Sequence, residues 1–255
     1  MACRDPTRVR RTLRSLKEAT GNQHIYGYAY DLSSLQQTRS FAAHLRRDIE
    51  RHFDGCLDVI INNAGVFEED LHTTEEGLEC TWAVNVAAPF LLTGELLDLV
   101  TERIVNVSSI SMADTLDFED LQQEKGYKRG GHAAYGASKL AVNMMTYRLA
   151  QKMEDTTVTV NCIDPGTVNT KLCYAGWGPV SHVAMPVEDA DDEFWSATSP
   201  DLAAVSGKYF VNKKPRRSSA FSYDEDAQQR LWEYLEKQAG LVYQVPWWRR
   251  ASRER

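Results

Sequence analysis

The sequence has no long hydrophobic run, no pair of cysteines spaced C-x-x-C and no excess of basic residues. Its apolar stretches, such as residues 57–61, fall far short of the ~20 residues that a helix needs to cross a bilayer. The first residues, MACRDPTRVRR, lack the apolar core of a secretory signal. We therefore expect a cytoplasmic protein with no membrane segment in this chain.

Charge and cysteine content exclude further classes of protein. The chain has 29 Lys and Arg against 36 Asp and Glu, a formal net charge of −7, so no nucleic-acid partner is expected. Its five cysteines are odd in number, which argues for reduced thiols and against a disulfide framework or a metal site. A hydrophobic content of 43% and a charged content of 25% are ordinary for a globular protein.

Short apolar runs alternate with helix-like stretches along the chain. Such runs suit strands that are buried on both faces, as in a parallel sheet. The predicted strands are residues 25–30, 57–61, 103–107, 157–163 and 208–211, and the predicted helices are residues 6–19, 33–53, 74–100, 133–153 and 224–239. This order predicts an α/β fold with a doubly wound, mostly parallel sheet of Rossmann type, whose ligands bind beyond the carboxyl ends of the strands.

Polar and glycine residues mark several helix ends. Asp5 is expected to cap the first helix and Gly240 to end the last, and Thr73 or Thr74 followed by Glu76 comes close to a capping box at the start of the third. No repeat or linker divides the chain, so we expect one domain over residues 1–255. Within it we expect a Rossmann-like core at 1–212, a substrate lid near 174–200 with a helix at 189–195, and a C-terminal helix with a basic tail at 213–255.

Four polar motifs lie at strand ends or open a helix. They are Asn62-Asn63-Ala64-Gly65, Ser108-Ser109, Tyr135-Gly136-Ala137-Ser138-Lys139 and Asp164-Pro165-Gly166. Tyr135 and Lys139 share a helix face, and an ammonium beside a phenol lowers the pKa of the phenol. Such a phenol exchanges a proton with a substrate oxygen that a serine hydroxyl holds. Each motif alone also fits a solvated tyrosine, a turn or an ordinary serine pair, but their joint order favours chemistry on an alcohol or carbonyl.

With these motifs the sequence resembles the short-chain dehydrogenase/reductase family, in particular its retinol-dehydrogenase and WW-domain-oxidoreductase-like group. The group features are the Asn-Val-Ser-Ser sequence that begins at Asn106 and the interval of 26 positions between Ser109 and Tyr135. The resemblance implies that Tyr135 is the general acid/base and that Lys139 lowers its pKa and binds the nicotinamide ribose. Ser109, in preference to Ser108, would orient the substrate oxygen.

The resemblance also implies further site residues. Asn85 would hold a proton-relay water, with a satisfied buried amide as the alternative. Asp31 and Leu32 would meet the adenine, and Asn62 and Ala64 the adenosine ribose. The residues implied to meet the nicotinamide carboxamide are Pro165, Gly166, Val168 and Thr170.

Arg4 decides the expected cofactor. A Rossmann site for NAD has an acidic residue at the end of the second strand, whereas an arginine there accommodates the 2′-phosphate of NADP. Arg4 is the first side chain past that strand, with Arg8 one turn further on, and the rival Asp5 is expected to be occupied as an N-cap. The expected cofactor is therefore NADP, with a solvated basic helix start as the alternative.

One family feature is absent from the sequence, the glycine-rich turn T-G-x-x-x-G-x-G between the first strand and first helix. The chain resembles the family from the second strand onward, so we expect an N-terminally truncated sheet with a gap between two half-sheets, or its repair by direct pairing of the flanking strands.

The implied function is NADP-dependent interconversion of an alcohol and its carbonyl on an apolar small-molecule substrate such as a retinoid, steroid or lipid aldehyde. The alternative is a catalytically impaired protein that acts as an interaction module. A homo-oligomer through the helices at 74–100 and 133–153 is left open.

Overall fold

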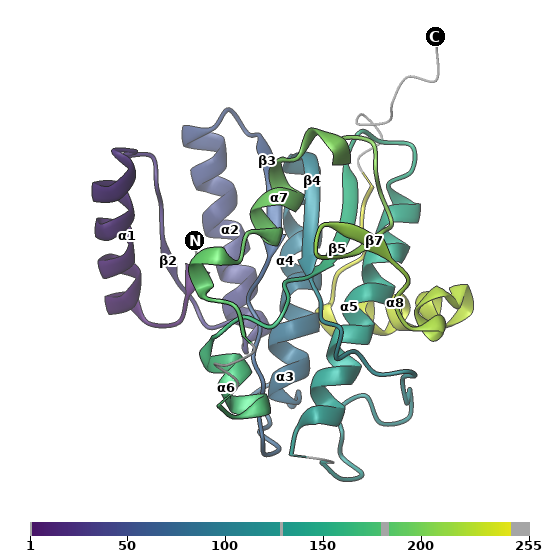
Figure 1. Ribbon diagram of the computed structural model, residues 1–255. Helices are drawn as coiled ribbons and strands as arrows, with labels where there is room; N and C mark the ends of the chain where they lie inside the picture. The colour runs from purple at the N-terminus through teal and green to yellow at the C-terminus, as the bar shows by residue number, and fades with distance from the viewer. Residues whose placement is uncertain (1, 128–129, 180–183, 246–255) are drawn as a thin grey trace.

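The central sheet has five strands in the order β3-β4-β5-β6-β7 (Figure 1). In this computed structural model, which describes residues 2–127, 130–179 and 184–245, the basic tail expected at the C-terminus lies outside the described residues. The first four strands, β3 (Leu57–Asn62), β4 (Val100–Val107), β5 (Thr159–Asp164) and β6 (Tyr209–Val211), are parallel. The predicted mostly parallel sheet is therefore confirmed.

An antiparallel strand, β7 (Lys214–Arg216), ends the sheet and was not predicted. It follows β6 through a turn at Asn212 and Lys213, both of which have a positive φ (49° and 59°). Its three residues are all exposed, so it shows no apolar alternation that would reveal a strand.

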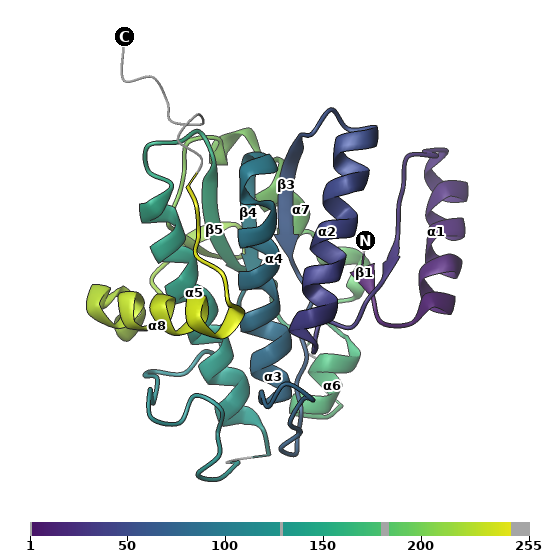
Figure 2. The same cartoon turned by 180° about the vertical axis from the view of Figure 1, so that it is seen from behind.

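Helices cover both faces of this sheet. Figure 2 shows α2 (Leu35–His52), α4 (Ala88–Leu96) and α5 (His132–Lys152) on one face, with α8 (Glu225–Ala239) crossing α5 and ending beside α4. The short helix α7 (Asp192–Thr198) covers the other face, and α6 (Lys171–Trp177) lies at the end of the sheet where the strands finish. The predicted cap at Gly240 is confirmed, since this residue adopts the left-handed conformation.

A second, two-stranded sheet stands apart from the first. Strands β1 (Ala2–Cys3) and β2 (Tyr28–Ala29) pair in parallel, and within the described part of the chain neither pairs with β3. The helix α1 (Pro6–Thr20) connects them and begins, as predicted, at Asp5, whose carboxylate accepts from the Thr7 amide at 2.8 Å. The expected gap between two half-sheets is present, and the alternative of direct pairing is not observed.

The predicted capping box is wrong. Residues 74–77 form a turn in which Gly77 has φ 81°, and the helix begins only at α3 (Cys80–Trp82). The cap is Glu79, whose carboxylate accepts from the amides of Thr81 and Trp82. Glu76 instead accepts from backbone amides at the start of α2. The two glutamates are close in sequence, and a local pattern does not show which helix each one caps.

The stretch Cys80–Leu99 continues through the π-helix η1 (Ala83–Ala87), α4 and the 3-10 turn η2 (Leu97–Leu99). Among the described residues it is the one stretch long and apolar enough to cross a membrane, although 78% of that window is buried inside the structure. A core helix of a globular protein passes the same test, and this stretch packs in the main hydrophobic cluster with α5 and α8.

The helix that was expected over the site at residues 189–195 is observed as α7 (Asp192–Thr198), and the charge of Asp164 at the end of β5 acts on its first residues, Asp192 and Glu193. The helix α7 packs on β4 and β5, and its Trp195 contacts the ring of Phe210 with centroids 5.4 Å apart. The apolar side of α7 therefore packs against the sheet. Within the segment 174–200, α6 lies at the carboxyl end of the sheet, and Met185 reaches the same end, where it pairs with Val168.

Candidate active site

The ends of β4 and β5 meet the first turns of α5, and three of the predicted catalytic residues come together there. Tyr135 and Lys139 are buried, with 5% and 4% of their surfaces exposed, and the Lys139 Nζ lies 5.5 Å from the centre of the Tyr135 ring. The Ser109 hydroxyl lies close enough to Tyr135 to lower the pKa of its phenol. A phenol, a hydroxyl and an ammonium therefore share one small site.

The two serines after β4 have different roles. The Ser108 hydroxyl is buried and donates to the Lys139 carbonyl oxygen at 3.1 Å, which ties β4 to α5. Ser109 is half-buried and is the serine that contacts Tyr135. That Ser109 orients the substrate oxygen stays a prediction, and its contact with Tyr135 is the observation that favours it over Ser108.

Burial controls the ionisation of this site. Burial raises the pKa of Tyr135 to about 12, the hydrogen bond from Ser109 lowers it, and Asp164 raises it. This direction is opposite to the one expected from a neighbouring ammonium, because burial is the largest cause of the shift. The Lys139 Nζ donates to the Val107 carbonyl oxygen at 2.9 Å. Burial lowers the pKa of Lys139 to about 8, and the Asp164 charge partly opposes the shift.

Asn85 lies in the π-helical turn η1, and every polar group of its side chain has a partner. Its Nδ2 donates to the Val66 carbonyl oxygen at 3.1 Å and to the Ser138 hydroxyl at 3.0 Å, and its Oδ1 accepts from the Val66 amide at 2.8 Å. It thereby holds the loop after β3 beside α5. A Cβ on Gly65 in that loop would lie 3.4 Å from the Asn85 Oδ1 and 3.6 Å from the Lys139 Nζ, so this loop lies in van der Waals reach of both side chains.

Three aromatic rings surround Tyr135. Phe67 and Trp177 lie 5.5 and 5.6 Å from its ring, and His132 lies 5.0 Å from Phe67 and 5.2 Å from Trp177. Trp177 belongs to α6 and is 40% exposed, so it separates the phenol from solvent. Phe67 is a site residue that the sequence analysis missed, because a single apolar residue after a strand carries no chemical signal.

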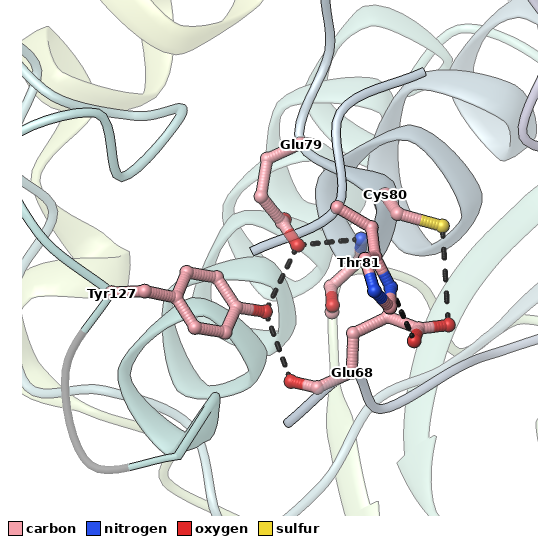
Figure 3. Close-up of polar contacts among 6 residues, drawn as sticks. Glu68, Glu79, Cys80, Thr81 and Tyr127 are labelled. Carbon is pink, nitrogen blue, oxygen red and sulfur yellow. Dashed lines mark hydrogen bonds and ion pairs between the residues drawn. The ribbon is translucent and has the colours of Figure 1, made fainter. Parts of the chain in front are cut away.

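The long interval between Ser109 and Tyr135 is anchored beside the site. Figure 3 shows the Tyr127 hydroxyl between the Glu68 carbonyl oxygen, at 3.0 Å, and the Glu79 carboxylate, at 3.1 Å. Earlier in the interval, Gln122 accepts from the Glu79 amide at 2.9 Å. One buried carboxylate therefore both caps α3 and fixes the segment that leads to Tyr135.

The residues expected at the adenosine end lie beyond β1 and β2. Burial raises the pKa of Cys80 to about 11, and among smaller effects Arg4 lowers it and Asp31 raises it, so both side chains lie near this thiol. Asp31 accepts from the Ser33 amide at 2.9 Å and is followed by Leu32. Arg4 is exposed and forms no ion pair among the described residues.

The other expected cofactor residues lie at the ends of β3 and β5. The Asn62 amide donates to Thr93 and Asn106, so its side chain points into the fold, whereas Ala64 is exposed. After β5 the chain turns at Pro165 and at Gly166, which has φ 77°. Val168 then pairs with Met185, and Thr170 caps α6 by accepting from the Cys173 amide at 3.2 Å.

The described residues fit the nicotinamide ribose of a cofactor better than its pyrophosphate. The buried Lys139 ammonium uses one of its three donors on Val107, which leaves donors beside the Gly65 loop for a ribose hydroxyl. Between the two sheets, by contrast, the described chain has no strand and glycine turn that would cradle a pyrophosphate.

Comparison with known proteins gives the class. The family model for short chain dehydrogenases matches residues 1–175. Human retinol dehydrogenase 13 is 34% identical over 94% of this chain and 76% of its own length, and human polyprenol dehydrogenase is 31% identical over 95% of this chain and 77% of its own length. The chain belongs to the short-chain dehydrogenase family.

Within the family it belongs to the retinol-dehydrogenase-like group, as the sequence motifs indicated. The assignment makes it an oxidoreductase of alcohols and carbonyls that uses a nicotinamide cofactor and a small-molecule substrate.

Solved structures share the fold. A protein from Mycobacterium paratuberculosis has a TM-score of 0.76 at 23% identity and covers 96% of this chain and 84% of its own. A short chain dehydrogenase from Shigella flexneri complexed with NADP has a TM-score of 0.64 at 23% identity and covers 82% of this chain and 84% of its own.

The expected cytoplasmic localisation is wrong. The curated relatives are named for retinol and polyprenol, which are lipids that dissolve in membranes, and the chain contains the apolar stretch Cys80–Leu99 described above. Uninterrupted apolar runs do not reveal this stretch, because it includes polar residues such as Asn85.

Proposed function

We propose that this chain is an NADP(H)-dependent oxidoreductase that interconverts an apolar alcohol and its carbonyl. The observation that carries the proposal is the placement of Ser109 and the buried ammonium of Lys139 beside the buried phenol of Tyr135. Bound cofactor would supply or accept the hydride. Tyr135, Ser109 and Lys139 would manage the proton at the substrate oxygen.

The raised pKa of Tyr135 suits the reductive direction. A phenol with a pKa of about 12 is protonated at neutral pH, so it can donate its proton to the carbonyl oxygen as the hydride reaches the carbonyl carbon. Ser109 would hold that oxygen by a second hydrogen bond. With its pKa near 8, Lys139 is mostly an ammonium at neutral pH and stabilises the phenolate that remains.

The case for NADP rests on Arg4. Asp5, the rival residue, is engaged as the N-cap of α1, which leaves the exposed Arg4 guanidinium as the group available to a 2′-phosphate. The adenosine contacts would come from Asp31, Leu32, Asn62 and Ala64. The carboxamide contacts would come from the turn that contains Pro165, Gly166, Val168 and Thr170.

The case for an apolar substrate rests on the walls of the site. Phe67 and Trp177 present aromatic surface directly against Tyr135, and Tyr174 and Ile110 are exposed apolar side chains on the neighbouring segments. Aromatic rings favour an extended apolar molecule over a sugar or an acid. The names of the curated relatives, retinol and polyprenol dehydrogenase, refer to substrates of this kind.

The split sheet favours the second candidate, an impaired enzyme that acts as an interaction module. The described chain offers no phosphate cradle, and the edge of β3 that faces β1 has no strand partner there. An unpaired edge is a template for pairing with another chain.

A single experiment separates the candidates. The purified chain is mixed with NADPH and retinaldehyde, and NADPH consumption is followed at saturating cofactor. Measurable reduction that is stronger with NADPH than with NADH supports the first proposal. A folded protein that neither binds nor consumes either cofactor supports the interaction module.

A further inference from the structure

A buried carboxylate that the mechanism above does not use lies between the serine segment and the Pro165–Gly166 turn. Asp164 is the last residue of β5 and is 3% exposed. One carboxylate oxygen accepts from the Ile110 amide at 2.6 Å, and the other accepts from the Gly166 amide at 2.8 Å. Two oxygens that both accept from N–H groups form the arrangement of an ionised carboxylate.

This carboxylate forms no direct ion pair within the described part of the chain, and the cation on which its charge acts is the Lys139 ammonium. Its field reaches the groups that move the proton, because the Asp164 charge raises the pKa of both Tyr135 and Lys139. A charge that acts on Tyr135 also acts on whatever is bound at the reacting carbon beside that phenol.

The inference rests on the proposed function and deepens it. An oxidised nicotinamide ring carries a positive charge, whereas the reduced ring is neutral. A fixed negative charge in a partly buried site therefore stabilises the oxidised ring selectively. We propose that Asp164 determines which oxidation state of the cofactor this site prefers, and that its carboxylate favours the oxidised form.

The experiment measures two affinities in each of four proteins. NADP⁺ and NADPH are titrated separately into the full chain by calorimetry. The variants are Asp164→Asn, which keeps the size and one acceptor, and Asp164→Ser, which changes the shape but also removes the charge. The control is Asp58→Asn at the opposite end of the sheet, where the carboxylate accepts from the Thr101 hydroxyl at 2.8 Å.

We expect the ratio of the NADP⁺ and NADPH dissociation constants to move about tenfold toward NADPH in both Asp164 variants, because both variants remove the negative charge that would favour the oxidised ring. The ratio should not change in Asp58→Asn. Loop damage alone weakens both forms together, so an equal loss of both affinities, or an unchanged ratio, would overturn the inference while leaving the proposed function intact. A wild-type chain that binds neither form would overturn both.

Discussion

The ammonium of Lys139 donates a hydrogen bond of 2.9 Å to the carbonyl oxygen of Val107, the last residue of β4. The bond fixes a buried charge of α5 at the end of the sheet, 5.5 Å from the Tyr135 ring. Such a charge is costly to bury, and its cost is visible in the lowered pKa of Lys139. The site therefore gives up some stability to hold this ammonium where proton transfer needs it.

Replacing Lys139 with Met should change how stability depends on pH. The pKa of this lysine is about 8 in the folded chain against 10.5 for an ordinary lysine, so between these values the unfolded chain binds more protons than the folded one. Because of Lys139, the free energy of unfolding increases as pH rises from 8 to 10.5. This gain is lost as pH falls back to 8. Urea unfolding across this range should show the slope in the wild type and a smaller slope in Lys139→Met. The exposed Lys171→Met is the control and should retain the wild-type slope.

Replacing Glu79 with Ala should destabilise the protein. The carboxylate caps α3 through the amides of Thr81 and Trp82 and also meets the Tyr127 hydroxyl, so at least the usual ~0.5–2 kcal/mol of an N-cap is lost. The nearby exposed Glu75→Ala should stay within about 0.5 kcal/mol of the wild type. Equal midpoints of thermal unfolding for the two variants would show that the Glu79 contacts contribute nothing.

The sequence revealed those features that follow from local pattern. The apolar strands β3, β4 and β5 and the helices α1, α2, α5 and α8 were predicted close to their observed bounds, since each has a clear period or a cap. The start of α3 was missed because Glu76 and Glu79 cap helices that are distant in sequence from one another. The aromatic surround of Tyr135 depends on Phe67 and Trp177, which only the tertiary fold brings together. The sequence places Asp164 at the end of a predicted strand, but it does not show that the carboxylate is buried or that it accepts from two backbone amides.

Replacing Arg4 with Ala should reduce cofactor discrimination. A hydrogen bond to a charged group contributes about 1.5–3 kcal/mol. The loss of a 2′-phosphate contact should therefore weaken the affinity for NADPH by at least about tenfold and leave the affinity for NADH unchanged. Arg14→Ala, further along α1, is the matched control. A variant that keeps the wild-type ratio of NADPH to NADH affinity would remove the argument for NADP.

The chain should be a monomer of 28.9 kDa in solution. The helix α8 and the segment after it cover α4 and α5 (Figure 2). The ring centroids of Trp232 and Phe90 lie 4.9 Å apart, and the Tyr243 hydroxyl donates to the Phe90 carbonyl oxygen at 2.6 Å. A homo-oligomer through α4 and α5 would have to displace these buried side chains. Light scattering after size exclusion measures the mass directly, and a stable dimer would contradict the expectation for this face.

The proton donor offers the most direct test of the account. Tyr135→Phe keeps the ring that packs on Phe67 and Trp177 and removes only the hydroxyl that Ser109 contacts. The measurement is the rate of retinaldehyde reduction by NADPH in the wild type and in this variant, with circular dichroism to confirm that both are folded. The account predicts measurable turnover in the wild type and at least a ~10²-fold lower rate in Tyr135→Phe. Equal rates in the two folded proteins would contradict it.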